Sequence, residues 1–273
     1  MRIGILGTRG IPNRYGGFEQ FAQILAAGLA KKGHEVCVYN SSLHPYKETK
    51  YGGVHIIHCK DPENRIGTAG QFIYDRHCLV DARQRNFDVL LHLGYTSDSI
   101  WWRRWPKNVI HIVNMDGMEW MRTKYNALTR RFLKYAEKLA AKHADILIAD
   151  SVGIQEHLLS KYGKHAVYIP YGAFVFDSPE QAVLKSFNQE PFSYSLLIAR
   201  MEPENNIEMI IKGWLASAAS TPLLIIGDTN KQYGRSLLRK YAQARIQFPG
   251  RSMIPLSSII SAIIRNIISM VIL

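Results

Sequence analysis

Cysteine is scarce in this chain of 273 residues, which contains only Cys37, Cys59 and Cys78 and no C-x-x-C pair. An odd number of widely spaced cysteines argues against a disulfide framework and against a zinc site, and it favours a reducing compartment. The N-terminal apolar run is too short for a signal peptide, and residues 1–250 contain no stretch that could span a bilayer. We therefore expect the body of the protein to be cytoplasmic.

Two nucleotide-binding fingerprints are also missing. The early glycines follow the pattern Gly4-x-x-Gly7-x-x-Gly10, which differs from the dinucleotide motif G-x-G-x-x-G. The second predicted strand ends near Asn40 without a carboxylate for a ribose hydroxyl, and the chain has no G-x-x-x-x-G-K-[ST] motif. The sequence therefore disfavours both an NAD-dependent oxidoreductase and a P-loop NTPase.

Acidic residues are few, 22 against 34 Lys and Arg, which gives a net charge of +12. This excess predicts an acidic partner, and nucleic acid, an anionic lipid surface or a phosphorylated substrate would each fit. No recognition-helix, zinc-finger or ribonucleoprotein motif supports nucleic acid, so we expect no nucleic-acid partner.

Two segments concentrate the positive charge. Residues 101–107 interleave tryptophans with cations, a mixture typical of proteins that contact lipid headgroups. Residues 122–143 are predicted to form a basic amphipathic helix. Such a helix could bind an anionic membrane, or it could pack its apolar stripe on the sheet and expose its cations to solvent. The sequence leaves both interpretations open.

Short apolar runs alternate with helical patterns along the chain, which predicts a doubly wound, mostly parallel α/β sheet. Helices are expected after the first strand, over 68–85, over 122–143 and up to Tyr162. The strands are expected at Ile3–Leu6, Glu35–Asn40, Val54–His58, Val89–Leu93, Val109–Val113, Ile146–Ala149 and Val167–Pro170.

The loop after the first strand is the strongest candidate site. Arg9 and Arg14 supply positive charge there, and Gly16 and Gly17 allow close approach of the backbone at the start of a helix. Ligands of open α/β sheets bind beyond the carboxyl ends of the strands, where further polar segments are expected: Gly94-Tyr95, Asn114 to Trp120, and Asp150-Ser151. Each segment also has a purely structural interpretation. The glycines of the loop could serve a turn alone, and Asp116-Gly117 could be a turn. Ser151 could be a helix N-cap, which is the favoured interpretation of that residue.

We predict an N-terminal Rossmann-like domain over 1–170, a linker over 171–192 and a partial second α/β domain over 193–250. The second domain has expected strands at Leu196–Ala199 and Leu223–Ile226, and expected helices from Ile207 and over Leu237–Ala244. Arg200 follows the first of these strands and precedes a helix, which repeats the arrangement of the opening loop. Two such edges in two domains predict a ligand cleft between them.

Three blocks make the chain resemble family 4 glycosyltransferases, most of all the rhamnosyltransferase-type subgroup with the uncharacterised N-terminal domain DUF1972. The blocks are Arg9 to Pro12 with Tyr15 to Glu19, Asn114 to Trp120, and Arg200-x-x-Pro203-Glu204-Asn205-Asn206. The resemblance implies a GT-B fold of two Rossmann-like domains with parallel sheets. It also implies retaining transfer of a sugar from a nucleotide diphosphate sugar to a lipid-linked saccharide in cell-surface polysaccharide synthesis, without a metal or other cofactor.

By resemblance, Asp116 and Glu119 are the catalytic candidates, with Asp116 orienting the acceptor or the reacting sugar. Donor binding falls to Gly16, Gly17, Arg200, Glu204 and Asn205, where Asn205 replaces the lysine usual in the wider family. Arg9, Arg14, Tyr95 and Ser151 are assigned to the acceptor side or the rim of the site. The expected partners are a nucleotide sugar, a lipid-linked acceptor and the anionic inner face of the plasma membrane.

The chain departs from the family after Gly250. Residues 251–273 form an apolar tail rich in isoleucine and serine, and the E-x7-E motif that holds the donor is absent. The tail fits a truncated or frameshifted second domain better than a membrane anchor, although its length would span a bilayer. This departure predicts an incomplete second domain with impaired donor binding. It keeps open two alternatives, a non-catalytic binding remnant and a nucleotide-sugar epimerase.

Overall fold

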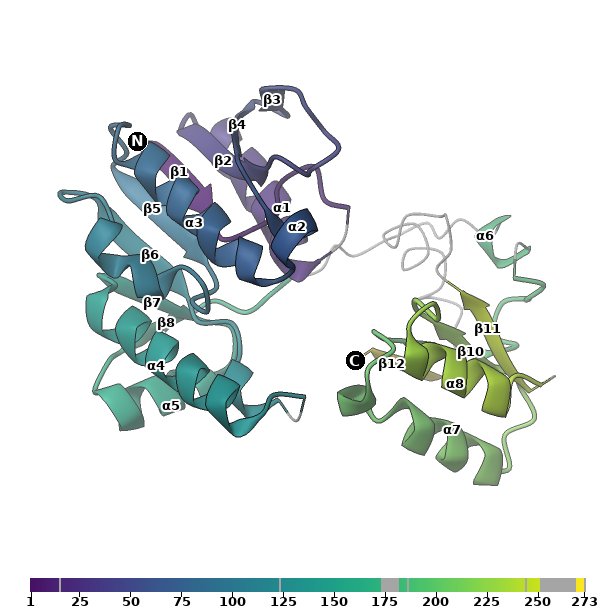
Figure 1. The fold of residues 1–273 in the computed structure, drawn as a ribbon. Helices are drawn as coiled ribbons and strands as arrows, with labels where there is room; N and C mark the ends of the chain where they lie inside the picture. Colours follow the sequence, from purple (N-terminus) through teal and green to yellow (C-terminus); the bar gives the residue numbers. More distant parts are fainter. Residues whose placement is uncertain are drawn as a thin grey trace. The chain divides into compact units, whose positions relative to one another are not determined.

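The computed structural model describes residues 1–14, 16–122, 124–172, 182–185, 187–243, 245–250 and 269–272. The chain divides into an N-terminal unit, Met1–Gly172, and a C-terminal unit, Ala173–Leu273 (Figure 1). Part of the linker predicted over 171–192 lies outside the described residues, and its described part includes a short helix at Ala182–Lys185. Each unit is an α/β structure, as predicted.

The described residues of the N-terminal unit form an eight-stranded sheet in the order β3-β4-β2-β1-β5-β6-β7-β8. All neighbouring strands are parallel apart from the short antiparallel pair β3–β4, which confirms the predicted mostly parallel sheet. The strands are β1 (Arg2–Leu6), β2 (Glu35–Ser41), β3 (Lys50–Tyr51), β4 (Val54–Cys59), β5 (Val89–Leu93), β6 (Ile110–Asn114), β7 (Ile146–Ala149) and β8 (Ala166–Tyr168). The helices are α1 (Gly17–Lys31), α2 (Glu63–Ile66), α3 (Ala69–Ala82), α4 (Ala127–His143) and α5 (Val152–Tyr162), with 3-10 turns η1 (Ser99–Arg104) and η2 (Glu119–Met121).

Helices cover both faces of this sheet, with α1 on one face and α3, α4 and α5 on the other (Figure 1). Ile5 and Val38 pack with Ala22 of α1 in one apolar layer. Tyr39 and Leu90 belong to the opposite layer, which also contains buried side chains of α3, α4 and α5. Burial on both faces explains why the strands appear in the sequence as continuous apolar runs rather than alternating ones.

Three predicted helices had wrong bounds. The helix expected over 122–143 begins only at Ala127, because the Asn126 side chain accepts the backbone N–H of Thr129 at 2.9 Å and caps the first turn. The helix expected over 68–85 covers only Ala69–Ala82, and the helix expected over Leu237–Ala244 is Gln232–Tyr241. Apolar periodicity therefore located the helices but misplaced their ends.

The C-terminal unit contains a four-stranded parallel sheet in the order β11-β10-β9-β12, counted over its described residues. Strand β12 comes from the apolar tail and pairs with β9, while residues 251–268 lie outside the described part of the chain. The elements are α6 (Ala182–Lys185), β9 (Ser195–Ile198), η3 (Pro203–Asn205), α7 (Ile207–Ala216), β10 (Leu223–Ile226), α8 (Gln232–Tyr241), β11 (Ile246–Gly250) and β12 (Ser269–Ile272). Among the described residues, no helix has both the length and the apolarity needed to cross a bilayer.

Candidate active site at the carboxyl edge of the N-terminal sheet

The loop between β1 and α1 presents the first turn of a helix that no side chain caps. Gly16 precedes this turn at φ 131°, and a Cβ there would collide with the Glu19 carboxylate. Glu19 is buried and accepts the backbone N–H of Arg9 at 3.0 Å, so its carboxylate holds the loop in place. Gly17 is exposed, and a Cβ on it would meet open space. The start of α1 can therefore bind an anion through its backbone amides.

Buried hydrogen bonds fix the same loop from its other side. The Thr8 hydroxyl accepts the N–H of Gly10 at 2.7 Å, and the Tyr74 hydroxyl donates to the Thr8 carbonyl at 3.1 Å. Asn40 binds both backbone groups of Ile11, at 3.0 and 2.7 Å. The loop is thus held in one conformation before any ligand arrives, which lowers the entropy cost of binding.

The two arginines of the loop are already engaged within the protein. The Arg9 guanidinium donates two hydrogen bonds, of 3.0 and 2.7 Å, to the Glu63 carboxylate at the start of α2. This contact and the charge of Glu63 raise the pKa of Arg9. Arg14 is exposed and also has an interaction partner. Glu63 therefore offsets the charge of Arg9.

Asp116 and Asp150 follow the neighbouring strands β6 and β7 and lie next to each other; we call them the acidic pair. Burial, the charge of Asp150 and a hydrogen bond between the two carboxyls together raise the pKa of Asp116 to about 6. Asn114 Oδ1 and Asp150 Oδ1 are buried without a hydrogen-bond partner among the described residues. An unpaired buried acceptor costs about 1–3 kcal/mol, so this edge of the sheet favours a ligand that donates hydrogen bonds.

Tyr171, after β8, connects the acidic pair to helix α1. Its hydroxyl accepts a hydrogen bond from Asn114 Nδ2 at 3.1 Å, and its ring meets Phe21 of α1 edge-on with 5.5 Å between centroids. Burial and the nearby charge of Asp116 raise the pKa of Tyr171. The acidic pair and the first half of α1 therefore belong to one continuous edge of the N-terminal unit.

The remaining predicted residues of this edge have structural contacts. The Tyr95 hydroxyl donates to the Gly117 carbonyl at 3.1 Å and accepts the Glu119 N–H at 3.3 Å, so Tyr95 supports the turn that carries Asp116. The Glu119 carboxylate pairs with Arg122 at 3.0 Å. Ser151 Oγ accepts the N–H of Ile154 at 3.4 Å and caps α5, which is the favoured interpretation from the sequence.

Arg200 lies in the C-terminal unit, two residues after β9. Its carbonyl accepts hydrogen bonds from Asn205 Nδ2 at 2.8 Å and from the Glu202 N–H at 2.7 Å. Its guanidinium is exposed and has no hydrogen bond or ion pair with any described residue. Glu204 belongs to the same turn and has an interaction partner. The turn thus presents one unengaged cation from a fixed backbone, while the predicted cleft between the two domains stays a prediction.

Asn114 and Asp150 lie in polar segments that were expected at this edge, but neither was given a role, and Tyr171 was not predicted to belong to the site. The pairing of Asp150 with Asp116 could have been predicted, because β6 and β7 are neighbours in a doubly wound sheet and the two residues follow their ends. Tyr171 gives no such signal, since it follows the edge strand β8 and returns toward Asn114 only in three dimensions.

The sequence of the chain matches a known protein-family model. The family model described as a domain of unknown function, DUF1972, matches residues 1–174, which is more than half of the chain. No protein of curated function matches the chain in sequence.

Solved structures share the fold at low sequence identity. HepE from Anabaena, solved with UDP and glucose, is 15% identical with a TM-score of 0.70, covering 96% of this chain and 72% of HepE. A glycosyltransferase from Rickettsia africae is 15% identical with a TM-score of 0.62, covering 96% and 70%. A UDP-N-acetylglucosamine 2-epimerase from Rickettsia bellii is 12% identical with a TM-score of 0.56, covering 99% and 73%. Because the family model covers the entire N-terminal unit and these similar structures cover 96% or more of the chain, the chain belongs to the DUF1972 family and has the fold of GT-B glycosyltransferases.

Proposed function

We propose that this protein is a glycosyltransferase that moves a sugar, rhamnose or a hexose, from a nucleotide diphosphate donor to a lipid-linked saccharide. In this proposal it belongs to the family 4 group, acts by retention without a metal, and serves cell-surface polysaccharide synthesis. The acceptor binds at the carboxyl edge of the N-terminal sheet, and the donor diphosphate binds Arg200. The DUF1972 match and the shared fold with HepE, which was solved with UDP and glucose, support the choice of class.

The acidic pair with its neighbouring unpaired oxygens is the observation that carries this proposal. Sugar hydroxyls are hydrogen-bond donors, and Asn114 Oδ1, Asp150 Oδ1 and the Asp116 carboxyl are acceptors gathered at one edge. A bound hydroxyl would satisfy acceptors that are otherwise buried without a partner. Asp116 accordingly orients the reacting hydroxyl through a charge-assisted hydrogen bond.

The donor side requires stabilisation of a diphosphate whose negative charge grows as the sugar leaves. The unengaged guanidinium of Arg200 and the uncapped amides of α1, at Gly16 and Gly17, are the two described elements suited to that charge. Asn205 contributes by fixing the Arg200 carbonyl, and Glu204 shapes the same turn.

Replacing Arg200 tests the donor assignment. Calorimetric titration with UDP-, dTDP- and GDP-sugars identifies the nucleotide sugar that binds the wild-type chain. Arg200→Ala is expected to weaken that binding about 100-fold, because a charged hydrogen bond contributes up to about 3 kcal/mol. Arg239→Ala, which removes an exposed cation of α8, is the matched control and should bind like wild type. Equal affinity of the Arg200→Ala and wild-type chains would remove Arg200 from the donor site.

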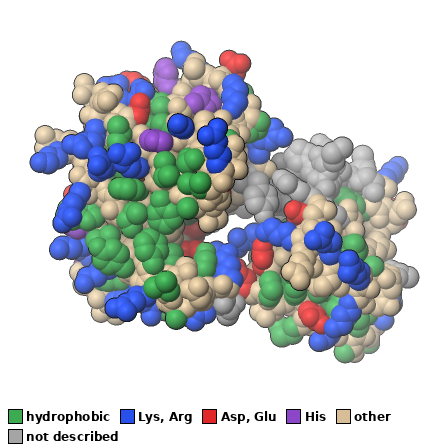
Figure 2. Space-filling model, viewed as in Figure 1, with side chains coloured by type: hydrophobic (Ala, Val, Ile, Leu, Met, Phe, Trp, Pro, Cys, Tyr) green, Lys and Arg blue, Asp and Glu red, His purple; other side chains and the backbone are tan. Residues whose placement is uncertain are grey.

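The face of the N-terminal unit that carries α3 and α4 is the proposed membrane-binding surface. Hydrophobic side chains lie beside Lys and Arg on this face (Figure 2). On α4, Leu128 is 78% exposed and Tyr135 is 55% exposed, and each is followed three residues later by an exposed cation, Arg131 and Lys138. The buried stripe of α4 packs in the core, which confirms that interpretation of the helix, while membrane binding by its exposed face is part of the present proposal. The tryptophans contribute less than expected, because Trp105 is buried. In this proposal the protein acts at the inner face of the plasma membrane.

Vesicle sedimentation tests this surface. The wild-type chain should sediment with vesicles rich in phosphatidylglycerol and stay in the supernatant with phosphatidylcholine alone. The double variant Arg131→Gln, Lys138→Gln should reduce binding about tenfold or more, since each cation near an anionic surface contributes about 1 kcal/mol. Unchanged sedimentation of that variant would contradict the assignment of α4.

Each of two alternative functions is favoured by its own observation. The similarity to a UDP-N-acetylglucosamine 2-epimerase favours an epimerase, which would convert its nucleotide sugar without any acceptor. The absence of the E-x7-E motif favours a non-catalytic binding remnant, which would release no nucleotide diphosphate.

A further inference from the structure

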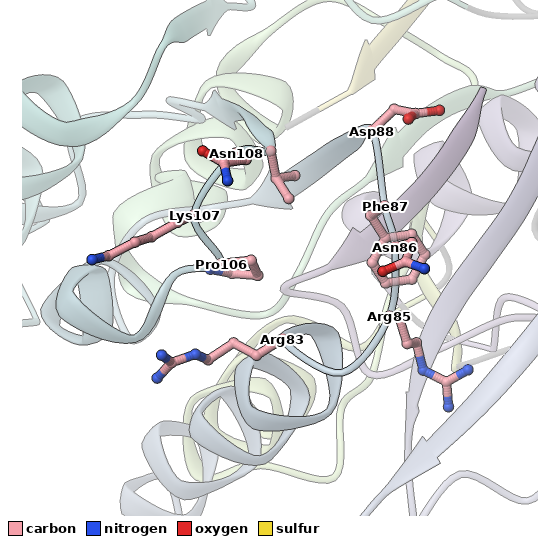
Figure 3. Close-up of a pocket in the computed structure, with 9 residues that line it drawn as sticks. Arg83, Arg85, Asn86, Phe87, Asp88, Pro106, Lys107 and Asn108 are labelled. Carbon is pink, nitrogen blue, oxygen red and sulfur yellow. The ribbon is translucent and has the colours of Figure 1, made fainter.

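A cavity of about 450 Å³ opens at the amino-terminal edge of the N-terminal sheet. It lies between residues 83–88, which lead into β5, and residues 106–109, which lead into β6 (Figure 3). The acidic pair lies at the other end of these strands. Five residues of β5, each rising about 3.3 Å, separate the two edges by about 16 Å. The cavity is therefore distinct from the candidate active site.

Two of the charged groups in this cavity have hydrogen-bond partners within the protein. Arg85 donates hydrogen bonds to both carboxylate oxygens of Asp81, and Asp88 accepts the backbone N–H of Arg2 at 2.7 Å. Asp81 therefore offsets the charge of Arg85, whereas the neutral N–H of Arg2 leaves the negative charge of Asp88 in the lining.

Arg83 and Lys107 are the two remaining cations of the cavity lining. Both are exposed, and neither side chain makes a hydrogen bond or an ion pair with any residue that the structure describes. Figure 3 shows both side chains extending toward the same side from different walls. They form a pair of unengaged cations facing one opening.

The rest of the lining combines amide groups with an apolar base. Asn86 and Asn108 are exposed and carry amides that can donate hydrogen bonds to an oxyanion. Asn108 has φ 61°, a left-handed conformation that asparagine tolerates in turns. Phe87 and Pro106 are buried beneath them. The cavity volume falls within the range of small-molecule sites.

We propose that this cavity, named here the basic pocket, binds a small phosphate monoester such as a sugar phosphate. The Arg83 guanidinium offers paired N–H donors that match two phosphate oxygens, and the Lys107 ammonium adds a second positive charge. The amides of Asn86 and Asn108 line the same cavity, and Asn86 lies across it from the ends of the two cations (Figure 3). The carbon skeleton lies against the apolar base. This assignment is independent of the glycosyltransferase proposal.

Calorimetry with glucose 6-phosphate as the probe and glucose as its uncharged counterpart tests the basic pocket. The wild-type chain should bind glucose 6-phosphate saturably and glucose not at all, because the two cations recognise the phosphate. The double variant Arg83→Gln, Lys107→Gln should weaken binding at least about 30-fold, as two charged hydrogen-bonding groups are lost. The double variant Arg131→Gln, Lys138→Gln removes the same charge from α4 and should bind like wild type.

Three results would overturn the proposal. One is no saturable binding of glucose 6-phosphate up to about 10 mM, a limit that corresponds to only about 2.7 kcal/mol. Another is equal binding of glucose, and the third is an equal loss in the two double variants, which would indicate a general charge effect. Asp116→Asn and Arg200→Ala should keep wild-type affinity for the probe, so failure here and failure of the proposed transfer activity can be told apart.

Discussion

Asp116→Asn is expected to lower the rate of sugar transfer about 100-fold or more, the largest functional effect of any single substitution in this account. In the proposed reaction the Asp116 carboxylate accepts a charge-assisted hydrogen bond from the acceptor hydroxyl, and an amide of the same shape is a much weaker hydrogen-bond acceptor. A loss of about 2.7 kcal/mol in transition-state stabilisation corresponds to that factor. The measurement is the steady-state release of nucleotide diphosphate at saturating donor and acceptor.

The pH dependence of the same reaction separates a direct role of Asp116 from a structural one. The pKa of Asp116 is raised to about 6, so the wild-type rate should fall as the pH decreases through 6 and the carboxylate becomes protonated. The asparagine variant has no proton to gain at this position and should lack that acid limb. Glu156→Gln, which changes an exposed carboxyl on α5, should keep both the rate and the acid limb. An Asp116→Asn chain with more than about a tenth of the wild-type rate would contradict the assigned role.

Glu137→Ala is expected to cost about 3–5 kcal/mol in the free energy of unfolding, the largest effect on stability. Glu137 of α4 is 1% exposed and accepts four hydrogen bonds, from Trp120 Nε1 at 2.7 Å, His157 Nε2 at 3.0 Å, Lys161 Nζ at 2.9 Å and Tyr162 OH at 2.6 Å. These donors overcome the burial of Glu137 and lower its pKa. Removing the carboxylate leaves several partly buried donors without an acceptor, and it detaches Trp120 and α5 from α4.

Urea unfolding followed by tryptophan fluorescence measures this cost, since four of the five tryptophans lie in the N-terminal unit. Glu156→Ala removes an exposed carboxyl from α5 and should change stability by no more than about 0.5 kcal/mol. Because the pKa of Glu137 is lowered in the folded state, its contribution is present at neutral pH and is lost as the pH falls through that lowered value. A Glu137→Ala chain that unfolds at the wild-type urea concentration would show that this cluster contributes little.

The sheet of the N-terminal unit could be predicted because its strands are buried on both faces. Val89–Leu93 and Ile146–Ala149 were predicted with the bounds that the structure shows, since each is a short and mostly apolar run between polar segments. The ends of the helices could not be predicted from apolar periodicity in the same way. At Asn126 a single side-chain cap, rather than the apolar periodicity, decides where α4 begins.

The candidate site was predictable as an edge of the sheet, whereas the roles of its residues were not. The ends of β1, β5, β6 and β7 were expected together because parallel strands present their carboxyl ends on one side. Arg9 was expected to bind an anion, yet its partner Glu63 lies 54 positions away in the chain, where no local pattern indicates the contact. Tyr171 is likewise brought to Asn114 by the fold, 57 positions apart.

The proposed transfer of a sugar from a nucleotide diphosphate donor to a hydroxyl on a lipid-linked acceptor can be measured in a single assay. The wild-type chain is incubated with a panel of nucleotide sugars, with and without membrane lipid extract, and the nucleotide diphosphate released is quantified. We expect release that requires both the lipid extract and Asp116. Conversion of the donor without the extract, or no release with any donor, would rule out the proposed function.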